Sequence, residues 1–473
     1  MSNHITRKRF LKKVSILTLG FTGLGNYLLS NSITKLNDLY CNLIKDPNGI
    51  INLPAGFQYT IVSQFKDKMR DGLQVPNHAD GMGCFGIDKN RVALIRNHEL
   101  GRFEEFNFKT DYKKSAFANI DTISDFYPSD LIYDRCNDGT PCFGGTTTTI
   151  YNTKKRKVEN EYLSLAGTLI NCSGGVTPWN TWITCEETVA KKNSFLTKNH
   201  GYNFEITPHL KREINPPNPI KSMGRFRHEA VAFHHGEVGA VYQTEDRKDG
   251  MIYRFLPKNK TQLLKGGKLQ ALSFIDEFSL DTRNWNKNKV KQGKSYNVRW
   301  FNIDDVESPD DNLREQGYHK GCAIFARPEG MWEHNGRIYF TCTSGGRKKL
   351  GQIWEYIPSF YEGLSNEKKY PGKLKLFFES DDAKDLDMCD NITLSPWGDI
   401  IICEDGGGVD YLVGIKWDGT SYKIAKNILN NSEFAGACFS PDGKILFLNI
   451  YKPTITLAIT GNWNQFFNDA GNC

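Results

Sequence analysis

The chain contains 473 residues, of which 39% are hydrophobic and 24% charged, and this is the composition of a globular protein rather than a disordered one. Its formal net charge is only +6, with 60 basic residues against 54 acidic ones, so we expect no nucleic-acid partner. The 12 cysteines include no C-x-x-C pair, which excludes a zinc ribbon.

The N-terminus has the pattern of an export signal. The basic segment TRKRFLKK at residues 6–13 precedes the apolar segment VSILTLGFTGLGNYLLS, and this order is typical of secretory targeting. The motif that begins at Arg7 resembles a twin-arginine signal, with Lys8 in the position of the second arginine. We therefore predict that residues 1–32 are a twin-arginine-like export signal or an N-terminal anchor. The twin-arginine export machinery would then be a partner, and the protein would be periplasmic or secreted in a bacterium.

One unit recurs along the rest of the chain. It has a short apolar strand, a tight Gly- or Asn-centred turn, a second apolar strand and often an acidic tip, as hairpins do. Its copies begin at Asp80, Gly174, Glu229, Glu329, Asn391 and Gly436. Repetition of one meander predicts an all-β fold, a six-bladed β-propeller with long inserted loops at 101–143 and 258–320. We expect residues 33–473 to form this single domain, as a monomer.

Acidic residues gather where these strands begin and end. In a propeller, the start of each innermost strand and the end of its antiparallel partner lie at the same mouth of the central channel. The strand ends expected there carry Glu99, Cys185-Glu186-Glu187, Glu245-Asp246 and Glu404-Asp405. So many carboxylates would repel one another unless metals or protons neutralise them. The pattern therefore predicts a metal site at the channel mouth.

The residue types indicate which metals such a site would take. Carboxylate and Asn oxygens suit calcium or magnesium, whereas the thiolate of Cys185 at a strand tip suits iron or another transition metal. The alternative for Cys185 is a buried core thiol. Arg327 precedes Glu329 by two residues and so lies on the same side of an extended chain, where it either clamps a phosphate or merely balances the acids. Cys136 and Cys142, in the loop CNDGTPC, could close a local disulfide.

Several ordered segments together resemble the PhoX-type alkaline phosphatase family, among them GGVTPWNTWITCEE, GRFRHEA, ARPEGMW and DNITLSPWGDIIICEDGG. The resemblance implies a secreted six-bladed propeller that hydrolyses phosphate monoesters with a pair of ferric ions (Fe3+) and two or three calcium ions (Ca2+). It makes Cys185 the iron-ligating cysteine, and Arg327 a phosphate contact. The acidic residues that it implies as metal ligands or their neighbours are Glu229, Glu329, Glu404, Asp405, Glu99, Glu186 and Glu187.

The hypothesis that follows is metal-dependent hydrolysis of small phosphate esters at the channel mouth, as an alkaline phosphatase that scavenges phosphate. Arg327, Glu329 and Cys185 are the expected catalytic residues. Two alternatives stay open: a calcium-dependent lactonase or esterase, and a non-catalytic binding propeller that metals only stabilise. A thiol at the site separates the first from the phosphatase, because a calcium-only lactonase has no use for it.

Overall fold

The computed structural model of the protein describes residues 42–101, 123 and 127–469, so the predicted export signal at 1–32 and most of the predicted loop at 101–143 lie outside the described residues. Within the described part, no helix is long and apolar enough to cross a membrane. The short helices are η3 (Ser129–Leu131), η4 (Lys221–Met223), η5 (Leu263–Lys265), α4 (Leu313–His319), η6 (Ser365–Lys368) and α5 (Trp463–Asp469).

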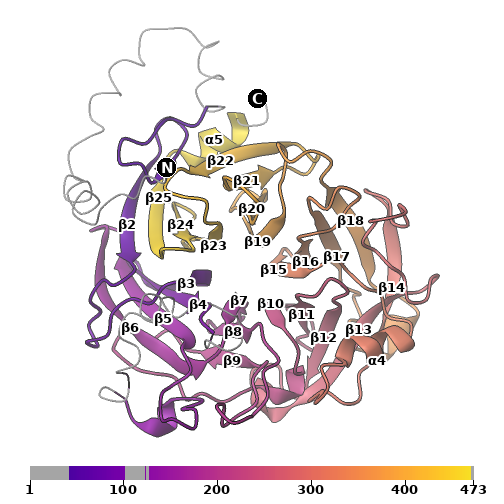
Figure 1. Cartoon of the computed structure of the whole chain (residues 1–473). Coiled ribbons are helices and arrows are strands. Elements are labelled where there is room, and N and C mark those ends of the chain that lie inside the picture. Colours follow the sequence, from indigo (N-terminus) through magenta and orange to yellow (C-terminus); the bar gives the residue numbers. More distant parts are fainter. Residues whose placement is uncertain (1–41, 102–122, 124–126, 470–473) are drawn as a thin grey trace.

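Innermost strands form a closed ring around the centre of the molecule (Figure 1). Each packs beside the next in chain order, and the last packs beside the first. They are β3 (Ala79–Asp88), β7 (Asn171–Val176), β10 (His228–Phe233), β15 (Pro328–His334), β19 (Cys389–Leu394) and β23 (Phe434–Phe439). This arrangement confirms the predicted all-β, propeller-like fold.

Antiparallel meanders run outward from this ring. The outer strands of the first half are β4 (Arg91–His98), β5 (Gly144–Asn152), β6 (Lys157–Thr168), β8 (Trp182–Glu186), β9 (Asn203–Ile206), β11 (Val241–Glu245), β12 (Ile252–Pro257), β13 (Gly267–Phe274) and β14 (Ser295–Asn302). Those of the second half are β16 (Arg337–Cys342), β17 (Gln352–Ile357), β18 (Lys373–Glu379), β20 (Ile400–Glu404), β21 (Tyr411–Ile415), β22 (Ser421–Asn427), β24 (Ile445–Ile450) and β25 (Ile455–Thr460). Runs such as Ile400–Ile402 are buried throughout, because the sheets pack on both faces.

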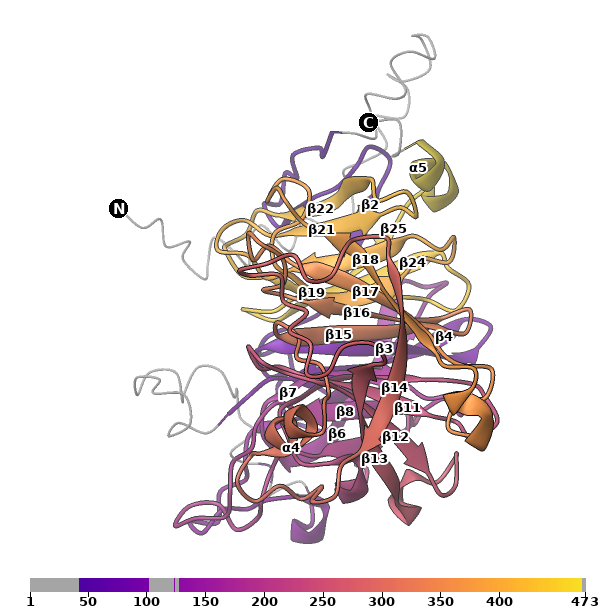
Figure 2. The same cartoon turned by 90° about the vertical axis from the view of Figure 1, so that its right-hand side faces the viewer.

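The described strands form five hydrogen-bonded sheets rather than six separate ones. The reason is β14, which pairs with β13 on one side and with β18 on the other, and so joins two meanders into one nine-stranded sheet (Figure 2). The segment 258–320, expected to be an inserted loop, therefore contains strands β13 and β14 and helix α4.

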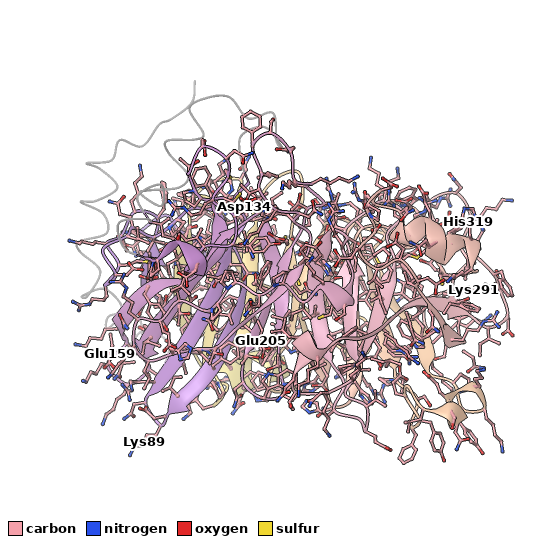
Figure 3. The ribbon with its side chains drawn as sticks, turned by 90° about the horizontal axis from the view of Figure 1, so that it is seen from below. Lys89, Asp134, Glu159, Glu205, Lys291 and His319 are labelled. Carbon is pink, nitrogen blue, oxygen red and sulfur yellow. The ribbon has the colours of Figure 1, made fainter. Side chains whose placement is uncertain are left out.

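The N-terminal strands complete sheets formed by the C-terminal part of the chain. Strand β1 (Ile51–Asn52) pairs with β22, and β2 (Gln58–Gln64) pairs with β25. Lys89, in the turn after β3, lies at one face of the disc, and Asp134, before β5, lies towards the opposite face (Figure 3). Because β4 and β5 connect these two levels, the starts of the innermost strands and the ends of their partners lie at the Asp134 face.

Candidate metal centre and active site

The same irregularity occurs near the start of five innermost strands. After the first residue pair, two residues of the inner strand oppose a single residue of its partner, which is a β-bulge. The first residue of each bulge is Asp80, Cys172, Glu229, Glu329 or Asp390. In β23 the irregularity comes one residue later, between Ala435 and Cys438, and offers no carboxylate. Equivalent bulges therefore present four carboxylates and one thiol towards the centre of the ring.

These side chains meet in one continuous group. Ligand atoms lie within 4.8 Å of one another in three overlapping sets: Asp80 with Glu99 and Cys172, Cys172 with Glu187 and Glu229, and Glu229 with Glu329 and Asp390. We call these seven residues the central cluster. Of the predicted ligands, the structure brings Glu99, Glu187, Glu229 and Glu329 together here.

A second row of acids comes from the ends of the partner strands. Glu99, Glu187, Asp246 and Asp405 each follow directly after β4, β8, β11 or β20. Asp405 lies close enough to the cluster to raise the pKa of Asp390, and these two carboxylates both raise the pKa of Glu433. Two sets of strand termini therefore converge on one place, as the sequence pattern indicates.

Burial dominates the electrostatics of the central cluster. It raises the pKa of Glu229, Glu187 and Glu329 well above the ordinary carboxyl range, and neighbouring carboxylates raise these values further. The same causes raise the pKa of Glu99 and Asp390 to about 7. A group of acids with such values takes up protons at neutral pH unless cations replace them.

Glu229 is the least satisfied side chain of the cluster. It is fully buried, and neither of its carboxylate oxygens has a hydrogen-bond partner among the described residues. Oδ1 of Asp80 is in the same situation. Buried polar atoms without partners are rare in native proteins and call for an ion, a water or a proton. Unpartnered carboxylates beside a thiol fit the donor set of bound metal ions.

Two guanidinium groups lie beside the acids. Arg327 donates hydrogen bonds from Nε and Nη2 to the two oxygens of Asp246, at 3.0 and 3.2 Å, and also pairs with Glu329. The backbone of Arg327 has a φ of +53°, a left-handed conformation that is costly for a residue other than glycine. Arg227 lies 3.5 Å from Glu187.

Cys185 does not lie with these acids, which corrects the prediction that its thiol faces the channel. It is buried in a hydrophobic cluster with Ile183 and Phe226, and burial raises the pKa of its thiol well above the ordinary value. Side chains alternate along a strand, so Cys185 and Ile183 share the core face of β8. The thiol of the central cluster belongs to Cys172, whose Sγ lies 3.4 Å from Asp80.

Glu186 and Glu404 also lie outside the central cluster, contrary to prediction. Each is the last residue of its strand. Its side chain therefore points to the opposite side from that of the acid that follows it, Glu187 or Asp405. Glu404 accepts hydrogen bonds from the N–H groups of Asp387 and Tyr411 and pairs with Lys423 at 2.9 Å. These bonds use both of its carboxylate oxygens to hold loops in place.

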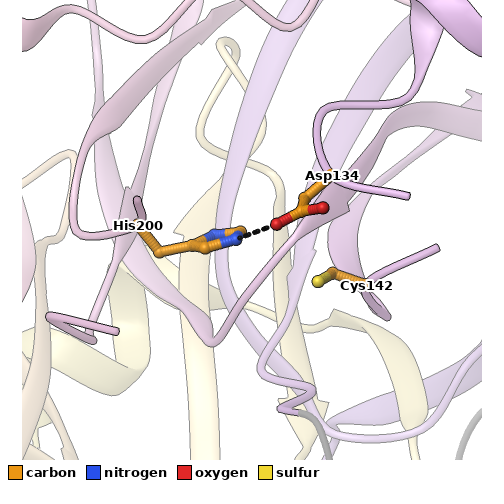
Figure 4. A group of neighbouring side chains, drawn as sticks. All are labelled: Asp134, Cys142 and His200. Carbon is orange, nitrogen blue, oxygen red and sulfur yellow. Dashed lines mark hydrogen bonds and ion pairs between the residues drawn. The ribbon is translucent and has the colours of Figure 1, made fainter. Parts of the chain in front are cut away.

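Glu186 belongs to a different buried group, together with His200 and Asp134. Figure 4 shows His200 and Asp134 of this group, with Cys142 beside them. His200 lies 2.6 Å from Glu186 through Nδ1 and 3.2 Å from Asp134 through Nε2, and the two carboxylates raise its pKa to about 9. Both ring nitrogens of the protonated His200 are therefore donors, so these three residues form a buried ion network. Ligand atoms of Asp134, His200 and Cys142 also lie within 4.8 Å of one another. Next to this network, the Sγ atoms of Cys136 and Cys142 lie 3.3 Å apart, and the disulfide stays a prediction.

A family model for the alkaline phosphatase PhoX matches residues 39–454 of the sequence. The chain belongs to the PhoX alkaline phosphatase family. Its class as a phosphatase and the predicted family resemblance are thereby confirmed. No curated protein matches the chain.

Among solved structures, Pseudomonas fluorescens PhoX, in complex with the transition-state analogue vanadate, is 17% identical with a TM-score of 0.63. The match covers 87% of this chain and 96% of that one, so the two PhoX chains share their fold. A gluconolactonase from Xanthomonas campestris is 10% identical over 87% of this chain and 97% of its own, with a TM-score of 0.39.

The sequence pattern starts a copy at Asp80 without naming it as a ligand, and it misses three further members of the site altogether: Cys172, Asp390 and Glu433. A local signal for the first two exists, because each bulge begins with a ligand residue followed by a small or Asn residue. The five pairs are Asp-Gly, Cys-Ser, Glu-Ala, Glu-Gly and Asp-Asn. Glu433 lies immediately before β23, outside this pattern.

Proposed function

We propose that this PhoX phosphatase hydrolyses phosphate monoesters at the central cluster, in a metal-bound form. The observation that carries the proposal is the unpartnered carboxylate of Glu229, buried between the Cys172 and Glu329 sides of the cluster. A buried carboxylate among other carboxylates is stable only when protons or cations neutralise it. Bound metal ions would supply positive charge for the phosphate oxygens and for the charge that develops at phosphorus.

The donor set favours two kinds of metal. The thiolate of Cys172, with the carboxylates on either side of it, suits Fe3+, and the carboxylates around the rim suit Ca2+. We propose a pair of ferric ions and two or three calcium ions. The residues that would hold them are Asp80, Glu99, Cys172, Glu187, Glu229, Glu329 and Asp390, with Asp246, Asp405 and Glu433 nearby.

Arg327 is the group best suited to bind and orient the phosphate of the ester. Asp246 holds its guanidinium through two hydrogen bonds, so the group is fixed before the substrate arrives. The side chain keeps 27% of its surface exposed, whereas that of Glu329 beneath it keeps 4%. A planar guanidinium in this position matches two phosphate oxygens.

Hydrolysis of p-nitrophenyl phosphate at alkaline pH by the iron- and calcium-loaded protein tests the proposal. Cys172→Ser should lower iron content and weaken a visible iron–thiolate absorption band, whereas Cys185→Ser is the matched control and should change neither. Absence of turnover by the fully loaded protein would contradict the proposal. Hydrolysis of a lactone with calcium alone would favour the lactonase instead.

We further propose that residues 1–32 direct export, so that the substrates are phosphate esters outside the cytoplasm. We also propose that the mature chain is a monomer with six blades, two of which are joined through β14 and β18. Support comes from the basic and apolar N-terminal pattern and from the ring of innermost strands. Cell fractionation after replacement of Arg7 and Lys8 by Gln tests the export route. Retention of normal export would exclude a twin-arginine signal.

A further inference from the structure

Four side-chain hydrogen bonds link neighbouring meanders around the ring in the same direction. Each donor lies on the second strand of one meander, and each acceptor is the backbone carbonyl of a bulge residue in the next meander. The bonds are Asn97 Nδ2 to Cys172 at 3.0 Å, Thr244 Oγ1 to Glu329 at 2.6 Å, Thr341 Oγ1 to Asp390 at 2.7 Å and Asn449 Nδ2 to Asp80 at 2.7 Å. The acceptors are therefore candidate metal-binding residues in every case.

Three of the four donors also occupy equivalent positions in their own meanders, whereas Asn449 pairs with Ala435, one residue pair before the bulge of β23. Asn97, Thr244 and Thr341 are the single residues that oppose a bulge. Thr244 shows the consequence most clearly, because its hydroxyl accepts the bulge N–H of Ala230 at 2.9 Å while donating to Glu329 of the next meander. One side chain thus connects two successive bulges, and all of these donors are fully buried.

We propose that Asn97, Thr244, Thr341 and Asn449 are positioning residues for the metal-binding cluster. A carbonyl held by a fixed donor sets the peptide plane of the bulge, and with it the direction in which the side chain leaves the backbone. Groups that orient metal ligands in this way contribute to metal affinity without touching the metal. This inference rests on the proposed function, since it requires that the cluster binds metals.

In strands β8 and β20, the residue that opposes the bulge is a cysteine instead. Cys185 opposes the bulge that begins at Cys172, and Cys403 opposes the one that begins at Asp390. A thiol is small and only a weak donor. Cys185 therefore occupies the position that holds a hydrogen-bond donor in other meanders. There it contributes hydrophobic packing rather than a strong hydrogen bond.

The test compares three variants of the full-length exported protein. Thr341→Val keeps the shape of the side chain and removes the hydroxyl, and Thr341→Ser restores the hydroxyl. Thr282→Val is the matched control, because Thr282 is also fully buried and donates to a backbone carbonyl, that of Ile324 at 2.8 Å, away from the central cluster. Iron content is measured by elemental analysis, and Ca2+ affinity by competition with a fluorescent chelator.

We expect Thr341→Val to bind Ca2+ or retain iron roughly 10-fold more weakly than the wild type. Thr341→Ser should regain most of this affinity, and Thr282→Val should keep it all even where its thermal stability falls. Equal metal binding by Thr341→Val and the wild type would overturn the positioning role and leave the proposed function intact. A wild-type protein that binds neither metal would overturn both.

Discussion

Glu186 and Glu187 are neighbours in the chain, yet their carboxylates face opposite sides of the end of β8. Glu186 lies 2.6 Å from His200 and accepts the N–H groups of Leu169 and Gly201 at 2.9 and 2.8 Å. Glu187 lies within 4.8 Å of the ligand atoms of Cys172 and Glu229. One acid therefore supports the fold and the next serves the site, and substitutions should separate the two roles.

Glu187→Gln should lower metal content while leaving the fold intact, because it removes one of several like charges from the cluster. A loss of roughly 10-fold or more in metal affinity is expected. Glu186→Gln should instead reduce the free energy of unfolding by about 3 kcal/mol, because it breaks a buried ion pair. Elemental analysis measures the metal content of both variants, and urea unfolding measures their free energy of unfolding. The same pattern of loss in both variants would contradict the division of roles.

His200 predicts a pH-dependent stability. Its pKa is raised from 6.5 to about 9, so its stabilising contribution is fully present below pH 6.5 and is lost as the pH rises through about 9. His200→Gln should therefore lower the free energy of unfolding by up to about 3 kcal/mol at pH 6. At pH 10 the difference from the wild type should be much smaller. Urea unfolding at the two pH values measures this, and a difference independent of pH would exclude a charged His200.

The fold class and the meeting of strand ends follow from the sequence, because repeated hairpins and acidic tips are local patterns. The orientation of individual residues does not follow. A bulge adds one residue to a strand, and a shift of one residue reverses which side every side chain faces. A pattern that begins the second repeat at Gly174 therefore misses the bulge at Cys172 and turns Cys185 towards the channel. The pairing of β14 with β18 depends on contacts distant in sequence and leaves no local pattern.

Arg327→Lys should impair catalysis without emptying the metal site. Lysine keeps the charge but cannot form the two parallel bonds that Arg327 makes with Asp246, so the cation is no longer fixed. We expect a fall in kcat/KM of roughly 100-fold for p-nitrophenyl phosphate, with unchanged iron and calcium contents. Steady-state kinetics and elemental analysis on the same samples test this. Loss of metal in parallel with activity would show that Arg327 supports the cluster rather than the substrate.

Glu229→Gln should destabilise the metal-loaded protein but stabilise the metal-free protein. In the metal-free protein, burial and neighbouring acids raise the pKa of Glu229 well above its ordinary 4.5, so the folded state at pH 8 must either take up a proton or bury a charge. Glutamine avoids this cost, and the metal-free variant should be more stable than the metal-free wild type by at least about 1 kcal/mol. In the metal-loaded protein the same substitution removes a ligand and should be destabilising. Urea unfolding at pH 8, with and without prior chelation, measures both effects, and near pH 4.5 the difference between the metal-free proteins should vanish. A variant that is less stable than the wild type in both states would mean that Glu229 is held by something other than a metal.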